Sequence, residues 1–306
     1  MTVVVGRNGV GKTTFFDVFG FLHDCLDKNV RKALDMRGGY REVVSRGKSG
    51  EPIELTIKFR PDPTHPRVTY VLQIGEVNGR PSVTKEQLLF RRGERGRGAL
   101  WKMLDFSNGK GSAVAGEPKT REDVKGEKRV EQKLDSPDIL AIKGMGQFSD
   151  FPAIASFRKM IEGWTVSDFR ISAAREIQDS VASERLSKTG DNLSQVAMYL
   201  YESHRPAFDE IICKMRSRIP GIDAVEAVPT IDNRLALRFQ DGAFKDPFLA
   251  KYASDGTMRM FAYLVLLSDP EPCSLLCVEE PENQLYPEIL TALAEEFREY
   301  GRRGQL

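Results

Sequence analysis

The feature that most constrains this chain is a glycine-rich segment near its start. The segment reads Gly6-Arg7-Asn8-Gly9-Val10-Gly11-Lys12-Thr13. It matches the spacing GxxxxGK[ST] at every fixed position, with a β-branched apolar run before it and a helical pattern after it. Glycines let successive backbone N–H groups turn inward toward phosphate oxygens, and the N-terminal end of the next helix favours the same anion. The sequence therefore predicts a buried strand over residues 2–5, a phosphate-binding loop and a helix.

The residue types in this loop predict separate contacts. Lys12 would add a full positive charge near the β and γ phosphates, and the hydroxyl of Thr13 suits magnesium. The alternative is a chance glycine turn, which average residue usage would produce in roughly one chain in a hundred of this length. The match in both spacing and context favours a nucleotide site. Its predicted residues are Gly6, Asn8, Gly9, Val10, Gly11, Lys12, Thr13 and Thr14.

An apolar run that ends in two acids supplies the predicted metal-binding and catalytic residues of the same nucleotide site. Residues 275–280 read Leu-Leu-Cys-Val-Glu-Glu, as expected for a buried strand with carboxylates at its end. A phosphate loop needs an acid on a neighbouring strand to hold hydrated magnesium, and Glu279 falls at that position. Glu280 is predicted to orient and deprotonate the attacking water, which makes it the candidate catalytic residue. The alternative is a pair of solvated acids at a strand end.

Overall charge gives no argument for a nucleic-acid or membrane partner. The chain has 306 residues, with 45 basic and 44 acidic side chains that nearly cancel. Residues 91–133 are locally basic, and we interpret them as a solvated hairpin or, alternatively, as a contact with nucleic acid or a protein partner. The basic residues concerned are Arg91, Arg92, Arg95, Arg97, Lys119, Arg121, Lys125, Lys128 and Arg129.

The cysteines and the hydropathy pattern indicate a cytoplasmic protein. No apolar run approaches the length that crosses a bilayer, so no membrane partner is expected. None of the four cysteines forms a CxxC pair, which favours reduced thiols over a zinc site or a disulfide framework.

The periodicity of the remaining chain predicts an α/β protein in three segments. Alternating residues at 53–59, a run at 68–74 and the turn dipeptide Asn78-Gly79 predict an antiparallel side sheet. Helical spacing is present at 151–164, 193–201, 206–219 and 258–267, strands are expected at 225–229 and 234–239, and a last helix runs from 287 to about 300. The predicted segments are 1–135 with the phosphate loop and side sheet, a helical subdomain at 136–222, and 223–306 with the acidic strand.

Three stretches carry a resemblance to a known family: residues 6–14, residues 253–257 (Ala-Ser-Asp-Gly-Thr) and residues 278–287 (Val-Glu-Glu-Pro-Glu-Asn-Gln-Leu-Tyr-Pro). They resemble the bacterial predicted AAA-family ATPases within the ABC-type clade that contains SMC, RecF and OLD-like proteins. The resemblance implies an α/β P-loop NTPase fold of ABC-ATPase type, with the antiparallel side sheet and helical subdomain noted above. It also implies ATP and Mg²⁺ as cofactors.

The resemblance further implies a homodimer closed by ATP. Two domains would enclose two ATP molecules head to tail, and Ser254, Asp255, Gly256 and Thr257 would form the signature turn that meets the γ-phosphate of the opposite copy. The alternative for this turn is a simple helix N-cap, and both interpretations can hold together. By analogy with the clade, the partner is DNA or a nuclease.

Two departures from the family pattern qualify this expectation. The metal-holding acid is Glu279 where most P-loop proteins have Asp, and the last histidine, His204, lies too early to serve as the family's switch histidine. The family also has strands before the P-loop strand, where this sequence has only five residues ahead of Gly6, and a strand with the switch histidine after the last helix, where this sequence reaches Leu306. The resemblance therefore implies a chain that lacks segments at both ends. A γ-phosphate-sensing glutamine is also implied, and Gln147 is its candidate.

Three functions remain open on sequence alone. The first is an ATPase whose dimer opens and closes with hydrolysis, and the second is an ATP-binding module with little turnover. The third is a P-loop kinase, which gives no role to the signature turn or to the pair Glu279 and Glu280.

Overall fold

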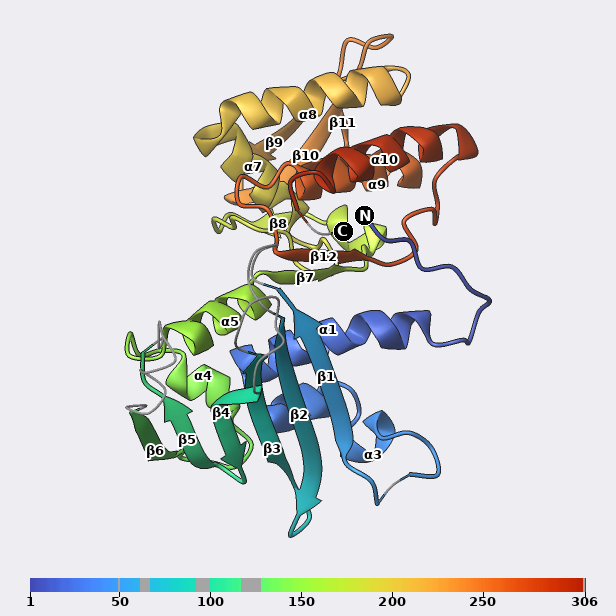
Figure 1. Ribbon diagram of the computed structural model, residues 1–306. Coiled ribbons are helices and arrows are strands. Elements are labelled where there is room, and N and C mark those ends of the chain that lie inside the picture. The colour runs from blue at the N-terminus through green and yellow to red at the C-terminus, as the bar shows by residue number, and fades with distance from the viewer. Residues whose placement is uncertain (49, 61–66, 92–99, 117–127, 305) are drawn as a thin grey trace. The chain divides into compact units, whose positions relative to one another are not determined.

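The computed structural model describes residues 1–48, 50–60, 67–91, 100–116, 128–304 and 306. Its contacts divide the chain into two compact units, each coloured by residue number in Figure 1. We call residues 18–163 the continuous unit, and residues 1–17 together with 164–306 the split unit. These boundaries differ from the predicted segments 1–135, 136–222 and 223–306. One boundary lies between Asp17 and Val18, inside the first helix. The other lies between Gly163 and Trp164, where a short strand begins that the sequence did not predict.

The continuous unit is built on an antiparallel sheet of six strands in sequential order (Figure 1). The first helix, α1, covers Lys12–Asp27 and crosses into this unit at Val18. The other elements are α2 Val30–Asp35, α3 Tyr40–Val43, β1 Ile53–Phe59, β2 Val68–Val77, β3 Arg80–Arg91, β4 Leu100–Ser107, β5 Lys110–Val114, β6 Arg129–Lys133, α4 Ala141–Met145 and α5 Pro152–Glu162.

The predicted side sheet is confirmed, and its local chemistry explains it. β1 alternates between half-buried and exposed residues, as expected of a strand with one face on a core. The β2–β3 turn uses Asn78 and Gly79 at φ of 54° and 71°, the left-handed values that a tight hairpin with matching twist requires. Phe157 of α5 stacks on Phe59 at 4.8 Å between ring centroids and closes the core.

One carboxylate, Glu86 of β3, lies fully inside this core. It accepts hydrogen bonds from the hydroxyl of Tyr70 at 3.0 Å and from the backbone N–H groups of Ala141 and Ile142 at 2.5 and 2.9 Å. These contacts tie the first turn of α4 to the sheet. Burial raises the pKa of Glu86 from 4.5 to about 7, against the lowering effect of these hydrogen bonds.

Six of the nine basic residues named for the predicted basic segment, 91–133, fall outside the described residues. These six are Arg92, Arg95, Arg97, Lys119, Arg121 and Lys125. Arg91 ends β3, and Lys128 is exposed just before β6. Arg129 donates to the carbonyl of Lys102 at 2.8 Å and to the hydroxyl of Ser112 at 3.3 Å, so its guanidinium is engaged within the sheet.

The split unit combines a parallel strand pair with a small antiparallel sheet and a helical layer (Figure 1). Its elements after the start of α1 are β7 Trp164–Ser167, α6 Ile171–Ala174, β8 Gln178–Asp179, α7 Leu193–Ser203, α8 Arg205–Arg218, β9 Ile222–Pro229, β10 Arg234–Asp241, β11 Phe248–Leu249, the 3₁₀ turn η2 Ala250–Tyr252, α9 Asp255–Leu267, β12 Leu275–Val278 and α10 Pro287–Tyr300. The predicted helices and strands from residue 193 onward are confirmed.

The core of the split unit surrounds α9. Every residue of this helix from Thr257 to Leu267 is buried, and side chains of α7, α8, α10 and β10 belong to the same apolar cluster. A helix that is buried all round cannot rely on an amphipathic pattern for its placement, so its position is set by these neighbours. No helix of the described chain is long and apolar enough to cross a membrane.

Two predicted elements differ from the structure. Residues 2–5 do not form a strand: Val3 and Val5 are 70% and 89% exposed, and no described strand pairs with the segment. A β-branched run favours extended backbone, but a strand needs a partner. The predicted helix at 151–164 ends at Glu162 with Gly163 as its C-cap, and Trp164 begins β7.

Candidate functional site

The glycine loop takes the backbone shape that its sequence predicts. Gly9 and Gly11 have φ of 80° and 94°, and a Cβ on either would meet nothing within 4 Å. Glycine is therefore favoured at these two positions for its backbone conformation, because other residues rarely adopt these φ angles. A Cβ at Gly6 would lie 2.9 Å from Cγ2 of the exposed Val10, so the Val10 side chain would have to shift. The predicted loop residues Asn8, Val10 and Thr14 belong to the same exposed turn and first helical residues.

Lys12 begins α1 and turns back into the loop. Its Nζ donates to the carbonyl of Gly6 at 2.7 Å and to that of Arg7 at 3.1 Å. The ammonium group is thus held by the loop's own backbone at the start of a helix, where the dipole also favours an anion. An anion that enters the loop would find a positive charge already directed toward its centre.

Thr13 meets Glu279 beside this loop. Partial burial raises the pKa of Glu279, and the carboxylates of Asp168 and Asp17 raise it further. The Thr13 hydroxyl and the ammonium of Lys188 act in the opposite direction. Two of the predicted metal-site residues therefore lie close enough for one to affect the pKa of the other.

The parallel pair of β7 and β12 explains why these acids gather. Val278 lies opposite Ser167, and the N–H of Glu279 donates to the carbonyl of Ser167 at 3.0 Å, so the pairing continues one residue past the strand. Asp168 follows β7 at the same edge, as expected where the carboxyl ends of parallel strands meet. The N–H of Asp168 donates to the carbonyl of Lys188 at 2.8 Å, which brings Lys188 beside the acids.

Sequence reasoning missed both Asp168 and Lys188. The predicted helix ended at residue 164, no element was expected at 165–167, and the partner strand of β7 lies more than a hundred residues further along the chain. Lys188 comes from a segment without regular structure, and its Nζ lies 3.9 Å from Asp17 of α1. No pattern in the sequence indicates either placement.

The side chains around Thr13 suit a hard divalent cation. A hydroxyl and carboxylates are oxygen ligands, and three acids face a single lysine there: Asp17, Asp168 and Glu279 against Lys188. In the described chain no three acidic, histidine or cysteine side chains converge closely enough to hold a metal by themselves. Magnesium commonly keeps several waters and adds phosphate oxygens, so two protein ligands such as Thr13 and Glu279 would be enough for it.

Glu280 has an unusual backbone conformation. Its φ is 43°, in the left-handed region that residues with a Cβ seldom occupy, and its side chain is exposed. The N–H of Asn283 donates to the Glu280 carbonyl at 3.0 Å and closes a turn directly after β12. Strain of this kind is found where the surrounding structure fixes a functional residue.

The signature turn caps α9. The Ser254 hydroxyl accepts from the N–H of Thr257 at 3.1 Å and pairs with the Thr257 hydroxyl at 2.8 Å, which confirms the N-cap interpretation. The N–H groups of Asp255 and Gly256 have no acceptor in the part of the chain that the structure describes. The Asp255 carboxylate accepts from Nη2 of Arg175 at 2.5 Å.

Gln147, the candidate sensing glutamine, is exposed in the continuous unit after α4.

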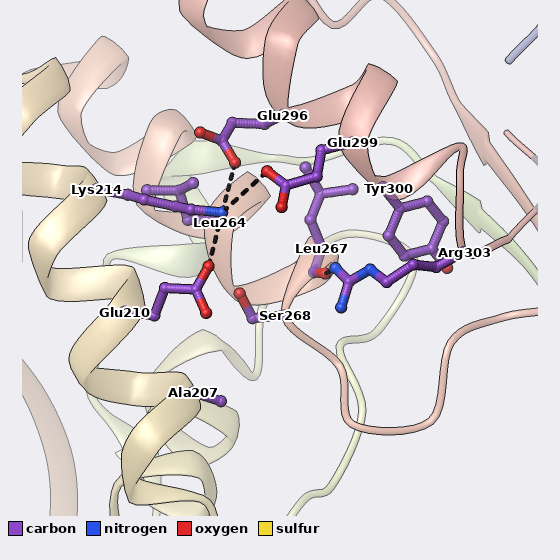
Figure 2. Close-up of a pocket in the computed structure, with 10 residues that line it drawn as sticks. All are labelled: Ala207, Glu210, Lys214, Leu264, Leu267, Ser268, Glu296, Glu299, Tyr300 and Arg303. Atoms are coloured by element: carbon purple, nitrogen blue, oxygen red, sulfur yellow. Dashed lines mark hydrogen bonds and ion pairs between the residues drawn. The ribbon is translucent and has the colours of Figure 1, made fainter.

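A separate pocket lies among α8, α9 and α10 (Figure 2). Figure 2 shows Lys214 at its centre, with Nζ at 3.0 Å from Glu210, 2.8 Å from Glu296 and 3.6 Å from Glu299. The lysine pairs with one acid of its own helix, α8, and with two acids of α10. The pocket contains none of the predicted site residues, and its charges join α8 to α10.

Comparison with known proteins agrees with this geometry. Residues 1–306 match the family model described as "AAA domain, putative AbiEii toxin, Type IV TA system". A search of curated proteins gives no match. The match covers the glycine loop, the acidic strand end and the signature turn together. The chain therefore belongs to this family of P-loop AAA domains.

Proposed function

We propose that this protein binds and hydrolyses ATP with magnesium, as an ABC-type head that dimerises around the nucleotide. The observation that carries the proposal is the position of the Thr13 hydroxyl beside the Glu279 carboxylate, next to a loop whose lysine is already turned inward. It joins the phosphate loop to the acidic strand end, the pairing that a P-loop ATPase uses for its metal.

Binding would begin with an exchange of acceptors. The Lys12 ammonium would leave the carbonyls of Gly6 and Arg7 for phosphate oxygens, while the loop N–H groups donate to the same anion. Thr13 and Glu279 would hold magnesium, which neutralises phosphate charge as it develops. A cation there would also offset the repulsion between Glu279 and Asp168.

Glu280 is the residue proposed to act on water. Its carboxylate would take a proton from the attacking water as the water oxygen bonds to the γ-phosphorus. The bond from that phosphorus to the oxygen of the β-phosphate breaks, and ADP and inorganic phosphate leave. Its exposed side chain and turn position after β12 support this role.

The second copy would complete the site. The unpaired N–H groups of Asp255 and Gly256 sit at a helix N-terminus and suit a γ-phosphate held by the opposite copy's loop. Closure with ATP and opening after hydrolysis would form the switch, and DNA or a nuclease is the partner we propose on fold analogy.

The direct test is Glu280→Gln. We expect ATP turnover to fall by about 100-fold or more, because general base catalysis contributes on that scale, while ATP affinity is retained. We also expect ATP-dependent dimers to accumulate by light scattering, because the closed state is no longer consumed. Glu282→Gln is the matched control, since it removes the next exposed acid of the same loop.

Three results would contradict parts of this proposal. Turnover by Glu280→Gln at the wild-type rate would show that Glu280 is not the base. Absence of ATP-dependent dimers in both proteins would remove the role of the signature turn in the opposite copy. Tight ATP binding without turnover by the wild type would favour a binding module.

A further inference from the structure

One charged side chain, Arg259, lies within the buried stretch of α9. The residue is 5% exposed, and its neighbours on the helix from Thr257 to Leu267 are uncharged. In the described part of the chain no carboxylate comes within ion-pair distance of it, and its Nε has no hydrogen-bond partner. Burial of a guanidinium without a counter-charge is unfavourable, so its presence calls for a role beyond packing.

The bonds of Arg259 join three segments of the split unit. Nη2 donates to the carbonyl of Phe169 at 3.2 Å and to Oε1 of Gln284 at 3.1 Å. Nη1 donates to the hydroxyl of Tyr263 on α9 at 3.4 Å. Phe169 directly follows Asp168 at the end of β7, and Gln284 belongs to the loop that begins with Glu280. One guanidinium therefore connects the signature helix to both acidic strand ends.

The loop that Arg259 holds is strained at both ends. Glu280 and Gln284 have φ of 43° and 60°, in the left-handed region that residues with a Cβ seldom occupy. The Gln284 carbonyl also packs on the first turn of α9, where a Cβ at Gly256 would lie 3.4 Å from it. Without a tether, the loop would relax toward ordinary backbone angles and turn the Glu280 carboxylate away from its present direction.

We infer that Arg259 is a positioning residue that acts through Gln284. It fixes the loop that carries Glu280 and joins that loop to the signature turn at the start of α9. The inference rests on the proposed function, because the group being positioned is the base for hydrolysis. In this proposal Arg259 does not contact the nucleotide.

Substitution of Gln284 tests the inference without removing the buried arginine. Gln284 is exposed, so Gln284→Ala should fold. We expect it to lower kcat for ATP by roughly 10- to 100-fold, the scale of a misplaced catalytic group, with ATP affinity within about threefold of wild type. Gln284→Glu keeps an acceptor and adds a charge-assisted bond to Arg259, so it should retain the wild-type kcat within about threefold. Asn283→Ala is the control, since no partner for that side chain is found in the described chain.

Hydrogen exchange in the nucleotide-free protein gives a second measurement. In Gln284→Ala the amides of residues 280–286 should exchange about tenfold faster or more, and those of α9 should not change. Arg259→Lys should also lower kcat and speed exchange of residues 280–286, because one ammonium cannot reach all three acceptors. No turnover by the wild type would overturn both the proposed function and this inference. An active wild type with unchanged kcat and exchange in Gln284→Ala would overturn the inference alone.

Discussion

A single carboxyl group, Glu86, makes the continuous unit sensitive to pH. Its pKa is raised to about 7 by burial, while the unfolded chain keeps the ordinary value near 4.5. Between these values the folded state binds more protons than the unfolded state, so stability must fall as pH rises through this window and level off above it. The shift corresponds to on the order of 3 kcal/mol.

Urea denaturation at pH values from 5 to 8 measures this effect. We expect the wild type to lose stability across that range, and Glu86→Gln to lose less. The variant should be less stable at pH 5, because one amide oxygen cannot accept from Tyr70 and both backbone N–H groups. The difference between the two proteins isolates Glu86 from other titrating groups. Equal slopes in both proteins would contradict the assignment.

Site residues were predictable from sequence where their signal is local. The loop lysine, Thr13 and the N-cap by Ser254 follow from fixed spacings within one turn or loop. Asp168 was not predictable, because its place depends on strand pairing across a long stretch of chain. Arg259 had a weak signal as one charge in an apolar helix, but its three acceptors come from the tertiary fold.

At the scale of elements, α8 and α10 are joined by a buried acid. Glu296 of α10 is 5% exposed and accepts from Lys214 of α8 at 2.8 Å (Figure 2). It also accepts from Arg218 of α8 at 3.3 Å. Loss of one partner of a fully buried pair costs about 3–5 kcal/mol. Both cations here keep some solvent and other acids, so the cost should be smaller.

We expect Glu296→Ala to reduce the free energy of unfolding by roughly 2–3 kcal/mol in urea denaturation. Glu299→Ala is the matched control on the same helix. Its carboxylate is 58% exposed and lies 3.6 Å from Lys214, so its loss should cost less than about 1 kcal/mol. Equal losses in the two variants would show that the buried acid does not dominate the contact between the helices.

The elements themselves were predicted best where neighbouring residues determine them. β1 and β2 follow from local patterns of apolar residues, and the turn dipeptide Asn78-Gly79 marks the hairpin between β2 and β3. The run at residues 2–5 has the same β propensity but pairs with no described strand. The short strand β7 was not predicted, because only its distant partner β12 identifies it as a strand.

At the scale of the whole molecule, the proposed dimer predicts that two inactive variants restore each other. Lys12→Ala removes the phosphate-loop charge but keeps the signature turn. Gly256→Glu keeps the loop and places an acid where the opposite copy's γ-phosphate would bind. The second substitution should fold, because the nearest atom to a new Cβ is 3.4 Å away and an acid in the first turn suits the helix dipole.

In a head-to-tail dimer of one copy of each variant, one of the two sites combines an intact loop with an intact signature turn. Random mixing makes half of the dimers mixed, so the equimolar mixture should hydrolyse ATP at about a quarter of the wild-type rate, while each variant alone stays near background. Gly256→Ala mixed with Lys12→Ala controls for loss of the glycine without added charge. A mixture no faster than its separate components would mean that each copy hydrolyses ATP with its own residues or not at all. Recovery would instead require that Lys12 of one copy and the signature turn of the other act on the same nucleotide.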